Sequence, residues 1–250
     1  MFIIKNKIFF LTFSALLVTA SLVVLVTLGL KPGIEFKGGA IVVAQYTNAV
    51  PELEQIKNQA KNLGLGDVTV QASGEKEVIV KTRSLVESDR PVLLQTLSIA
   101  GAFPYTEKSF SAIGPSISKE LTTKSILAVI FVSLAIIIFV TIAFRKVSKP
   151  VASWKYGLIT IATLLHDITI PAGLYAYLGY AYGAEVDTLF VVALLTILGV
   201  SISDTIVIFD RIRENLRNIG GTNKINFGEI VGKSLEQSYV RSICTSLTVI

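Results

Sequence analysis

Residues Ile8 to Leu30, IFFLTFSALLVTASLVVLVTLGL, form a run of 23 residues without a charge. A helix of about 20 apolar residues crosses the hydrocarbon core of a bilayer, so this run predicts a membrane span. It exceeds the roughly 7 to 15 apolar residues of a secretory signal, and no small-residue cleavage site precedes Lys31. We therefore interpret it as an anchor that stays in the protein.

Three further runs have the length of a membrane span. Ser125 to Phe144 is uncharged over 20 residues, and Gly157 to Gly179 and Thr188 to Phe209 carry only a few ionisable side chains. A fifth apolar run begins near Ser238 and reaches the end of the sequence after 13 residues, so we expect the chain to stop inside a fifth span. With 52% hydrophobic and 16% charged residues, a purely soluble enzyme is excluded.

The basic residues predict the orientation, because Lys and Arg gather in short loops on the cytoplasmic side. They lie before the first span and after the second and fourth spans: Lys5, Lys7, Arg145, Lys146, Lys149, Lys155, Arg211, Arg213, Arg217, Lys224 and Lys233. The turn between the third and fourth spans carries Glu185 and Asp187 instead. We expect a cytoplasmic N-terminus and an extracytoplasmic segment over residues 31–123. The net charge of +5 is then a topology signal, so nucleic-acid binding is rejected.

The segment between the first two spans has a hydrophobic period of two, which is typical of strands. It predicts the order strand, helix, strand, strand, helix, strand of a ferredoxin-like α+β sandwich. The expected ranges are Ala40 to Tyr46, Pro51 to Leu63, Asp67 to Ala72, Glu77 to Arg83, Asp89 to Ala100 and Tyr105 to Ile113. The fold class is thus a polytopic helical bundle with an inserted α+β domain, divided into residues 1–30, 31–123 and 124–250.

Local signals define the ends of the two helices in this segment. Gly64 and Gly66 are expected to end the first helix. Asp89 is the expected N-cap of the second, with Pro91 in its first turn and Gly101 ending it.

No catalytic constellation emerges from the sequence. The chain has one Cys, Cys244, and one His, His166, so a disulfide framework and a His-rich metal site are excluded. Phosphate loops, G-x-S-x-G elbows and H-E-x-x-H motifs do not occur. We predict that the protein is not an enzyme, needs no cofactor, and uses its outer domain as a binding or mechanical module.

Two opposite charges interrupt the last apolar segments. An ionisable residue at the centre of a span costs at least about 2.5 to 3.5 kcal/mol, so it is by default a candidate functional residue. Asp204 lies six residues, hence ~9 Å, from the end marked by Asp210, and Arg241 enters the fifth run at what we expect to be a similar depth. Gly199, Ser201 and Ser203 would let a neighbouring helix approach. The two charges can form a titrating relay or a static ion pair, or Arg241 can snorkel to the interface.

The third span carries a second candidate. Asp167 lies near its middle, beside His166. Neighbouring side chains on a helix point about 100° apart, so the two need not share one site. Asp167 is a candidate for the proton relay, whereas a lone His is as often an interhelical hydrogen-bond donor.

Three motifs resemble those of the SecD/SecF family of protein export proteins. Directly after the first span, GIEFKGG resembles the family's GIDFKGG-type motif, with the residues Gly33, Glu35, Lys37, Gly38 and Gly39, and with Glu in place of the commoner Asp. The sequence LHD at residues 165–167 and the run SDTIVIFDRIREN at residues 203–215 are also similar to the family pattern; the second run includes Asp210, Arg211, Arg213, Glu214 and Asn215. The Gly-Gly pair also has a purely structural explanation, a tight turn into the first strand.

The resemblance implies an accessory subunit of the Sec translocon, related to resistance-nodulation-division transporters, in a prokaryotic plasma membrane. Its implied partners are SecD, the SecYEG channel, YajC, membrane lipids and translocating preproteins, which it would help to draw outward with the proton-motive force after SecA has driven the early steps. The family's essential Asp and Arg fall on Asp204 by motif and on Arg241 by position. Family members have six spans, so the sixth helix is expected to be missing. Two alternatives stay open: a half-transporter that exports a small lipid or drug, and a passive scaffold for SecD.

Overall fold

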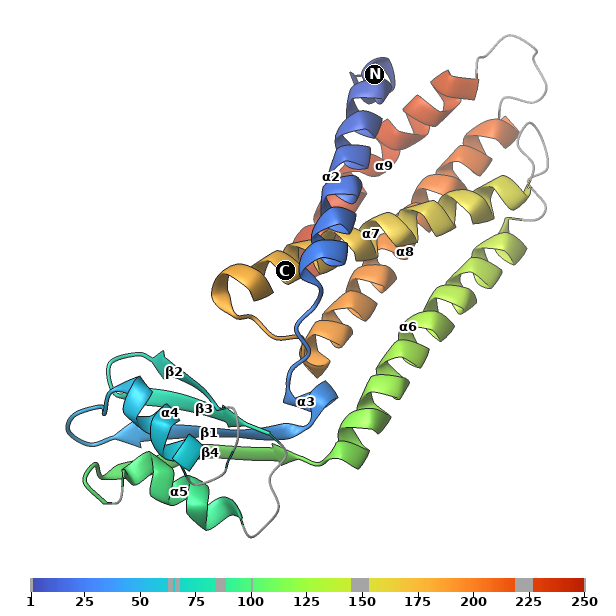
Figure 1. The fold of residues 1–250 in the computed structure, drawn as a ribbon. Coiled ribbons are helices and arrows are strands. Elements are labelled where there is room, and N and C mark those ends of the chain that lie inside the picture. Colours follow the sequence, from blue (N-terminus) through green and yellow to red (C-terminus); the bar gives the residue numbers. More distant parts are fainter. Residues whose placement is uncertain are drawn as a thin grey trace. The chain divides into compact units, whose positions relative to one another are not determined.

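The computed structural model describes residues 2–62, 65, 68–83, 89–99, 101–144, 153–218 and 227–249 (Figure 1). The chain divides into two compact units. The first, here called the helical unit, comprises Met1–Lys31, Leu127–Glu185 and Leu189–Ile250. The second, the α/β unit, comprises Pro32–Ile126 and Val186–Thr188.

The α/β unit contains a four-stranded antiparallel sheet in the order β2-β3-β1-β4 (Figure 1). Its elements are α3 (Ile34–Lys37), β1 (Gly39–Tyr46), α4 (Leu53–Asn62), β2 (Thr69–Ser73), β3 (Glu77–Thr82), α5 (Arg90–Ser98) and β4 (Tyr105–Ile113). Each helix joins two strands that are not neighbours in the sheet, which is the split arrangement predicted from the sequence. The ferredoxin-like prediction is therefore confirmed. Gly64 and Gly66, the expected end of α4, lie outside the described residues.

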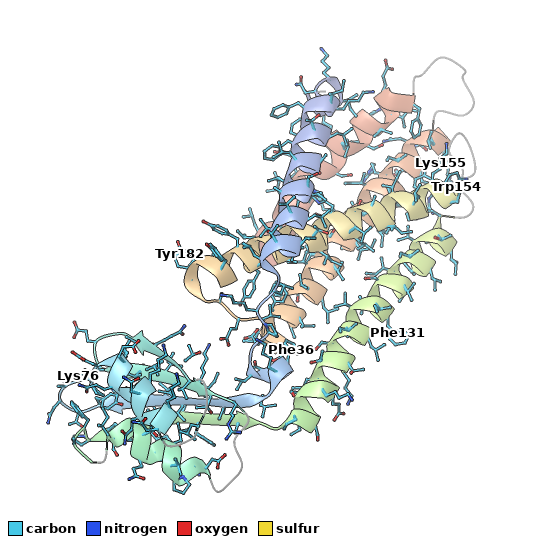
Figure 2. The ribbon with its side chains drawn as sticks, in the orientation of Figure 1. Phe36, Lys76, Phe131, Trp154, Lys155 and Tyr182 are labelled. Carbon is cyan, nitrogen blue, oxygen red and sulfur yellow. The ribbon has the colours of Figure 1, made fainter. Side chains whose placement is uncertain are left out.

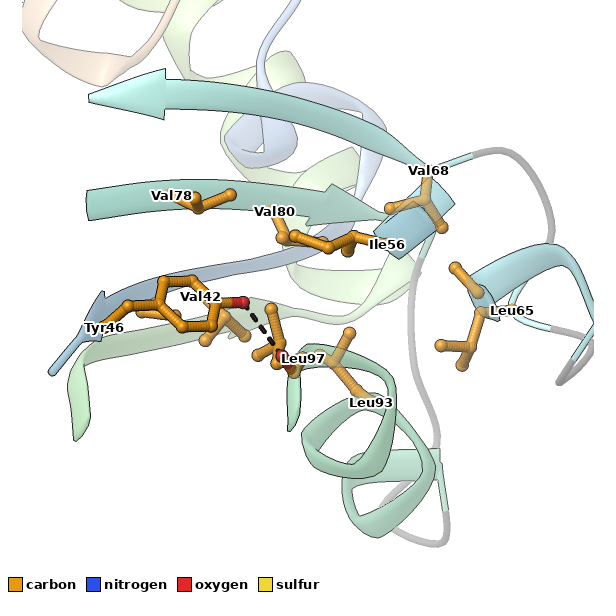
Figure 3. Close-up of a cluster of buried hydrophobic side chains, with 11 residues drawn as sticks. Val42, Tyr46, Ile56, Leu65, Val68, Val78, Val80, Leu93 and Leu97 are labelled. Carbon is orange, nitrogen blue, oxygen red and sulfur yellow. Dashed lines mark hydrogen bonds between the residues drawn. The ribbon is translucent and has the colours of Figure 1, made fainter. Parts of the chain in front are cut away.

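Alternating residues of the two central strands form the core of the α/β unit (Figure 3). Val42 and Tyr46 of β1 and Val80 of β3 are buried against Ile56 of α4 and Leu97 of α5. The Tyr46 hydroxyl donates a hydrogen bond of 2.9 Å to the Leu97 carbonyl oxygen. Burial, with a smaller effect of nearby Tyr105, raises the pKa of Tyr46 to about 12, because an apolar environment disfavours the charged phenolate.

Helix α5 ends differently from the expectation. Asp89 is its N-cap and Pro91 lies in its first turn, as expected, but the Asp89 side chain makes no capping hydrogen bond. The helix ends at Ser98 because Ile99 takes the left-handed conformation, with φ 45° and ψ 62°. A β-branched residue rarely adopts this conformation. The expected terminator, Gly101, lies two residues further on with a φ of 90°.

The helical unit contains α1 (Phe2–Lys5), α2 (Lys7–Leu28), α7 (Ser153–Tyr182), α8 (Thr188–Asn218) and α9 (Phe227–Val249), and α6 (Pro115–Ala143) extends into it. Among the described residues, α2, α6, α7 and α8 are long and apolar enough to cross a membrane. Many of their apolar side chains lie on the surface, among them Phe131 and Tyr182 (Figure 2). The protein is therefore a multi-pass membrane protein, as the sequence predicts.

Helices α2 and α7 cross closely at one glycine. A Cβ atom at Gly173 would lie 2.6 Å from the Cα atom of Ser21 and 2.9 Å from its carbonyl oxygen. Small residues let helix backbones approach in this way, which is a main source of helix association in lipid. A larger residue at position 173 would separate the two helices.

An aromatic cluster joins α6, α7 and α8 within the helical unit. Tyr156 of α7 packs on Phe209 of α8, with ring centroids 4.9 Å apart, and on Phe144, which directly follows α6, at 5.7 Å. Val140 of α6 and Ile212 of α8 complete the buried cluster. This cluster fixes α6, α7 and α8 near the end of α8 that carries the basic residues.

Candidate functional site

A cavity of about 490 Å³ lies between α7, α8 and α9 in the helical unit. Four of the polar side chains that line it are His166 and Asp167 of α7 and Ser201 and Asp204 of α8. The remaining lining residues are Ile170, Pro171, Thr196, Ile197, Val200 and Ser246. Two carboxylates from two different membrane helices thus share one cavity, and we call this the carboxylate cavity.

Hydrogen bonds hold the Asp167 carboxylate from both helices. Its Oδ1 atom lies 2.8 Å from His166 Nδ1, and its Oδ2 atom accepts a hydrogen bond from the Ser201 hydroxyl. The Asp167 side chain is 21% exposed and that of His166 is 37% exposed. The structure therefore brings His166 and Asp167 into one site, although adjacent helical positions do not require it.

Two features of the helices shape this cavity. Ser201 lies three residues before Asp204 on α8, so the two side chains share one face of the helix. On α7, Pro171 lies four residues after Asp167 and has no amide hydrogen to donate to the Asp167 carbonyl. Ser201 thus brings a hydroxyl group to the Asp167 carboxylate, and Pro171 removes one backbone hydrogen bond from α7 beside the cavity.

The depth expected for Arg241 is wrong. Helices α8 and α9 run antiparallel, and Asn215 of α8 donates hydrogen bonds of 2.8 Å and 2.9 Å to Ser234 and Gln237 of α9. In the same register, Arg241 lines a second cavity with Asp210, whereas Ser246 lines the carboxylate cavity with Asp204. Arg241 is thus level with Asp210, which lies six residues, or ~9 Å along the helix axis, from Asp204.

No ion pair or hydrogen bond joins Asp204 to Arg241 within the part of the chain that the structure describes. Side-chain contacts between the helices set this register, and the lengths of the apolar runs do not encode it. Neither the static pair nor a relay contact is formed in this conformation. Direct pairing of Arg241 with Asp204 therefore requires a change of side-chain or helix position.

Sequence reasoning treated Ser201 only as a small residue and overlooked Gly173. The signal for Ser201 was its spacing of three residues from Asp204, which places a hydroxyl group on the same helix face. For Gly173 the signal was the small pair Ala172 and Gly173 inside a predicted span. Within the described ranges, no group of three His, Cys, Asp or Glu residues could hold a metal ion.

The glycines after the first span have a structural role in the α/β unit. Gly33 is the N-cap of the short helix α3, and its amide donates a 2.7 Å hydrogen bond to the Val186 carbonyl oxygen. Gly38 ends α3 with a φ of 78°. Gly39 begins β1, where a Cβ atom would lie 2.6 Å from the Thr82 carbonyl oxygen. The expected tight turn into the first strand is present, and both glycines are required by it. Glu35 and Lys37 lie within α3.

The charged run on α8 forms contacts along its own helix and to α9. Arg213 pairs with Asp210 and Arg211 with Glu214, each at 2.8 Å. Asn215 connects the end of α8 to α9 through the two hydrogen bonds given above. This run therefore stabilises the helix end and fixes the pairing of α8 with α9.

The chain is similar to known protein export proteins over its whole length. The family model "Protein export membrane protein SecD/SecF, C-terminal" matches residues 96–250, and the model "SecD/SecF GG Motif" matches residues 23–50. The protein translocase subunit SecF of Thermobaculum terrenum is 35% identical over 260 residues, covering 99% of this chain and 80% of the relative.

The SecDF relatives match only in part of their length. Protein translocase subunit SecDF of Bacillus subtilis is 32% identical, and the match covers 98% of this chain and 32% of the relative. The crystal structure of SecDF, a translocon-associated membrane protein from Thermus thermophilus, matches with a TM-score of 0.79 and 28% identity, over 99% of this chain and 32% of that one. The chain belongs to the SecD/SecF family of protein export membrane proteins.

Proposed function

We propose that this protein is an accessory subunit of the Sec preprotein translocase that couples the proton-motive force to late steps of export. Its SecF relatives bear the name protein translocase subunit. The observation that carries the coupling is the carboxylate cavity, in which Asp167 and Asp204 from two membrane helices face one space. Ionisable groups inside spans are costly, and they mark proton paths in pumps and transporters.

In this proposal Asp204 takes up a proton from one side of the membrane and releases it to the other. Protonation of Asp204 removes a charge from the cavity that it shares with Asp167, whose carboxylate accepts the Ser201 hydroxyl hydrogen, so the hydrogen-bonded contact between α7 and α8 responds to it. One proton moved through 100 mV supplies about 2.3 kcal/mol, which shifts a two-state equilibrium by roughly fiftyfold. The helices would pass this change to the α/β unit.

Arg241 belongs to the proposed cycle as the partner of Asp204 in a second conformation. In the present one it is level with Asp210, so pairing requires α9 to shift along α8 or the side chain to reach toward Asp204. An arrangement with two discrete registers of this kind is a recognised form of conformational switch. The α/β unit is proposed to lie outside the membrane, with the N-terminus in the cytoplasm, and SecD, SecYEG and YajC are the proposed partners.

The test measures preprotein export into inverted membrane vesicles with and without an imposed proton-motive force. Asp204→Asn is expected to remove most of the stimulation by the proton-motive force, and Asp167→Asn to reduce it. Glu236→Gln, which neutralises an exposed carboxylate of α9, serves as the matched control and should export as the wild type does. Normal stimulation of export by the proton-motive force in Asp204→Asn would overturn the proposal. The passive scaffold for SecD would then be the favoured alternative. Efflux of a small lipid or drug without an export defect would favour the half-transporter.

A further inference from the structure

A second cavity, of about 340 Å³, lies between α6, α8 and α9 and has two chemically different sides. One side is apolar and consists of Phe139, Ala143, Phe144, Ile206 and Val207. The other side is charged and consists of Asp210, Arg211, Arg213 and Arg241. We call it the arginine cavity. All its lining residues belong to the helical unit.

The charged side has an excess of cations. Three arginines line it against one acidic residue, Asp210, whose carboxylate pairs with Arg213 at 2.8 Å. Arg211 has its own partner in Glu214, at 2.8 Å. Among the residues that the structure describes, the Arg241 guanidinium forms no ion pair or hydrogen bond. The cavity thus contains at least one cation without a counter-charge.

Arg241 is exposed on α9, and its apolar neighbours favour such a counter-charge. Its neighbours on α9, including Tyr239, Val240 and Ile243, present exposed side chains of apolar character. An unpaired arginine in an apolar membrane environment is costly unless it reaches water, a carboxylate or a lipid headgroup. The cavity joins this cation to an apolar wall, and that combination fits an amphiphilic anion.

We propose that the arginine cavity binds an anionic phospholipid, with the phosphate group on Arg241 and Arg213 and the start of an acyl chain against Phe139 and Val207. Guanidinium groups bind phosphate oxygens in a bidentate manner. Basic pockets between membrane helices are suited to anionic headgroups. A free phosphate ion would use the charged side alone and leave the apolar wall unexplained. This proposal does not depend on proton coupling.

The test is native mass spectrometry of the chain purified in detergent, with phosphatidylglycerol or phosphatidylcholine added at equal concentration. We expect several-fold more phosphatidylglycerol than phosphatidylcholine adducts. Arg241→Gln should lower phosphatidylglycerol binding about fivefold, because one basic group contributes about this factor to the affinity for an anionic lipid. Arg217→Gln removes the same charge from an exposed position of α8 outside the cavity and should change little. Equal losses in the two variants, or no preference between the lipids, would overturn the proposal.

A second variant separates a lipid from a free anion. Ala143→Phe keeps every charge and fills the apolar side of the cavity, so it should lower phosphatidylglycerol binding as Arg241→Gln does. Inorganic phosphate in excess should compete only weakly in the wild type. Unchanged lipid binding in Ala143→Phe, or full displacement by inorganic phosphate, would mean that the charged side alone forms the site and would contradict the lipid assignment.

Discussion

In the α/β unit, Leu93 and Leu97 are fully enclosed, with 0% of their surface exposed, whereas Phe131 and Leu134 of α6 expose 64% and 48%. Both regions are rich in apolar residues, but they use them differently. The α/β unit removes them from water by packing two helices on one face of a sheet. The helical unit presents them outward, where the acyl chains of a bilayer replace water.

Polar groups show the reverse arrangement. In the α/β unit, charged side chains such as Lys57 and Glu54 are exposed and pair on the surface. In the helical unit, Asp167 and Ser201 meet between helices, and Asp204 faces the same cavity. Exposed ion pairs contribute little free energy, whereas a carboxylate inside a membrane is costly and therefore indicates function. The comparison thus separates residues that stabilise the fold from residues that carry the proposed coupling.

The same substitution in the two regions should give the largest contrast. Leu97→Ala removes a fully buried side chain from the α/β core, and we expect the free energy of unfolding of that unit to fall by about 2 to 5 kcal/mol. Leu134→Ala removes an exposed side chain of α6 and should leave this free energy unchanged. Hydrogen exchange of the β1 and β3 amides in the full chain measures both. Equal effects would contradict the distinction between an enclosed core and a lipid-facing surface.

Close packing within the helical unit can be tested at a glycine. Gly173→Ala places a Cβ atom against the backbone of Ser21, so we expect α2 and α7 to separate at a cost of about 1 to 3 kcal/mol. Gly199→Ala is the matched control, because a Cβ atom there meets nothing within 4 Å. Cysteine cross-linking between α2 and α7 measures the separation. Identical cross-linking in both variants and the wild type would show that the crossing is not set by this contact.

The smallest expected effect concerns the buried hydroxyl of the α/β core. Tyr46→Phe removes the hydrogen bond to Leu97 and should cost about 1 kcal/mol. The folded-state pKa of Tyr46 is raised to about 12, above the ordinary value of about 10. Its contribution is therefore fully present below about pH 10 and is lost as the pH rises through about 12.

Urea unfolding at several alkaline pH values measures this dependence. Stability of the α/β unit should fall over that range in the wild type and fall less steeply in Tyr46→Phe. Tyr180→Phe, which changes an exposed tyrosine of α7, is the control and should keep the wild-type slope. A wild-type slope in Tyr46→Phe would mean that Tyr46 is not the group responsible.

Much of the fold follows from short-range patterns in the sequence. The alternation of Val42, Ala44 and Tyr46 predicts a strand with one buried face, and the length of the apolar runs predicts four spans. The end of α5 was not predictable, because Ile99 takes a backbone conformation that its side chain disfavours. Such a conformation is imposed by the surrounding packing and not by the local sequence.

The candidate site was predictable only in part. Asp167 and Asp204 stood out because charges are rare in spans, but the sequence could not place them in one cavity. That requires the register of α7, α8 and α9, which contacts such as those of Asn215 with Ser234 and Gln237 determine. The same register separates Arg241 from Asp204 by about 9 Å along the helix axis. The lengths of the apolar runs do not encode this separation.

Proton flux is the most direct test of the claim that the membrane helices carry the coupling site. Inverted vesicles containing this chain and its translocase partners, loaded with a pH-sensitive dye, are followed during preprotein export under an imposed proton-motive force. We predict that proton release from the vesicle lumen in Asp204→Asn falls to the level of vesicles without the chain, whereas Glu236→Gln behaves as the wild type does. Wild-type proton release in Asp204→Asn would contradict the account.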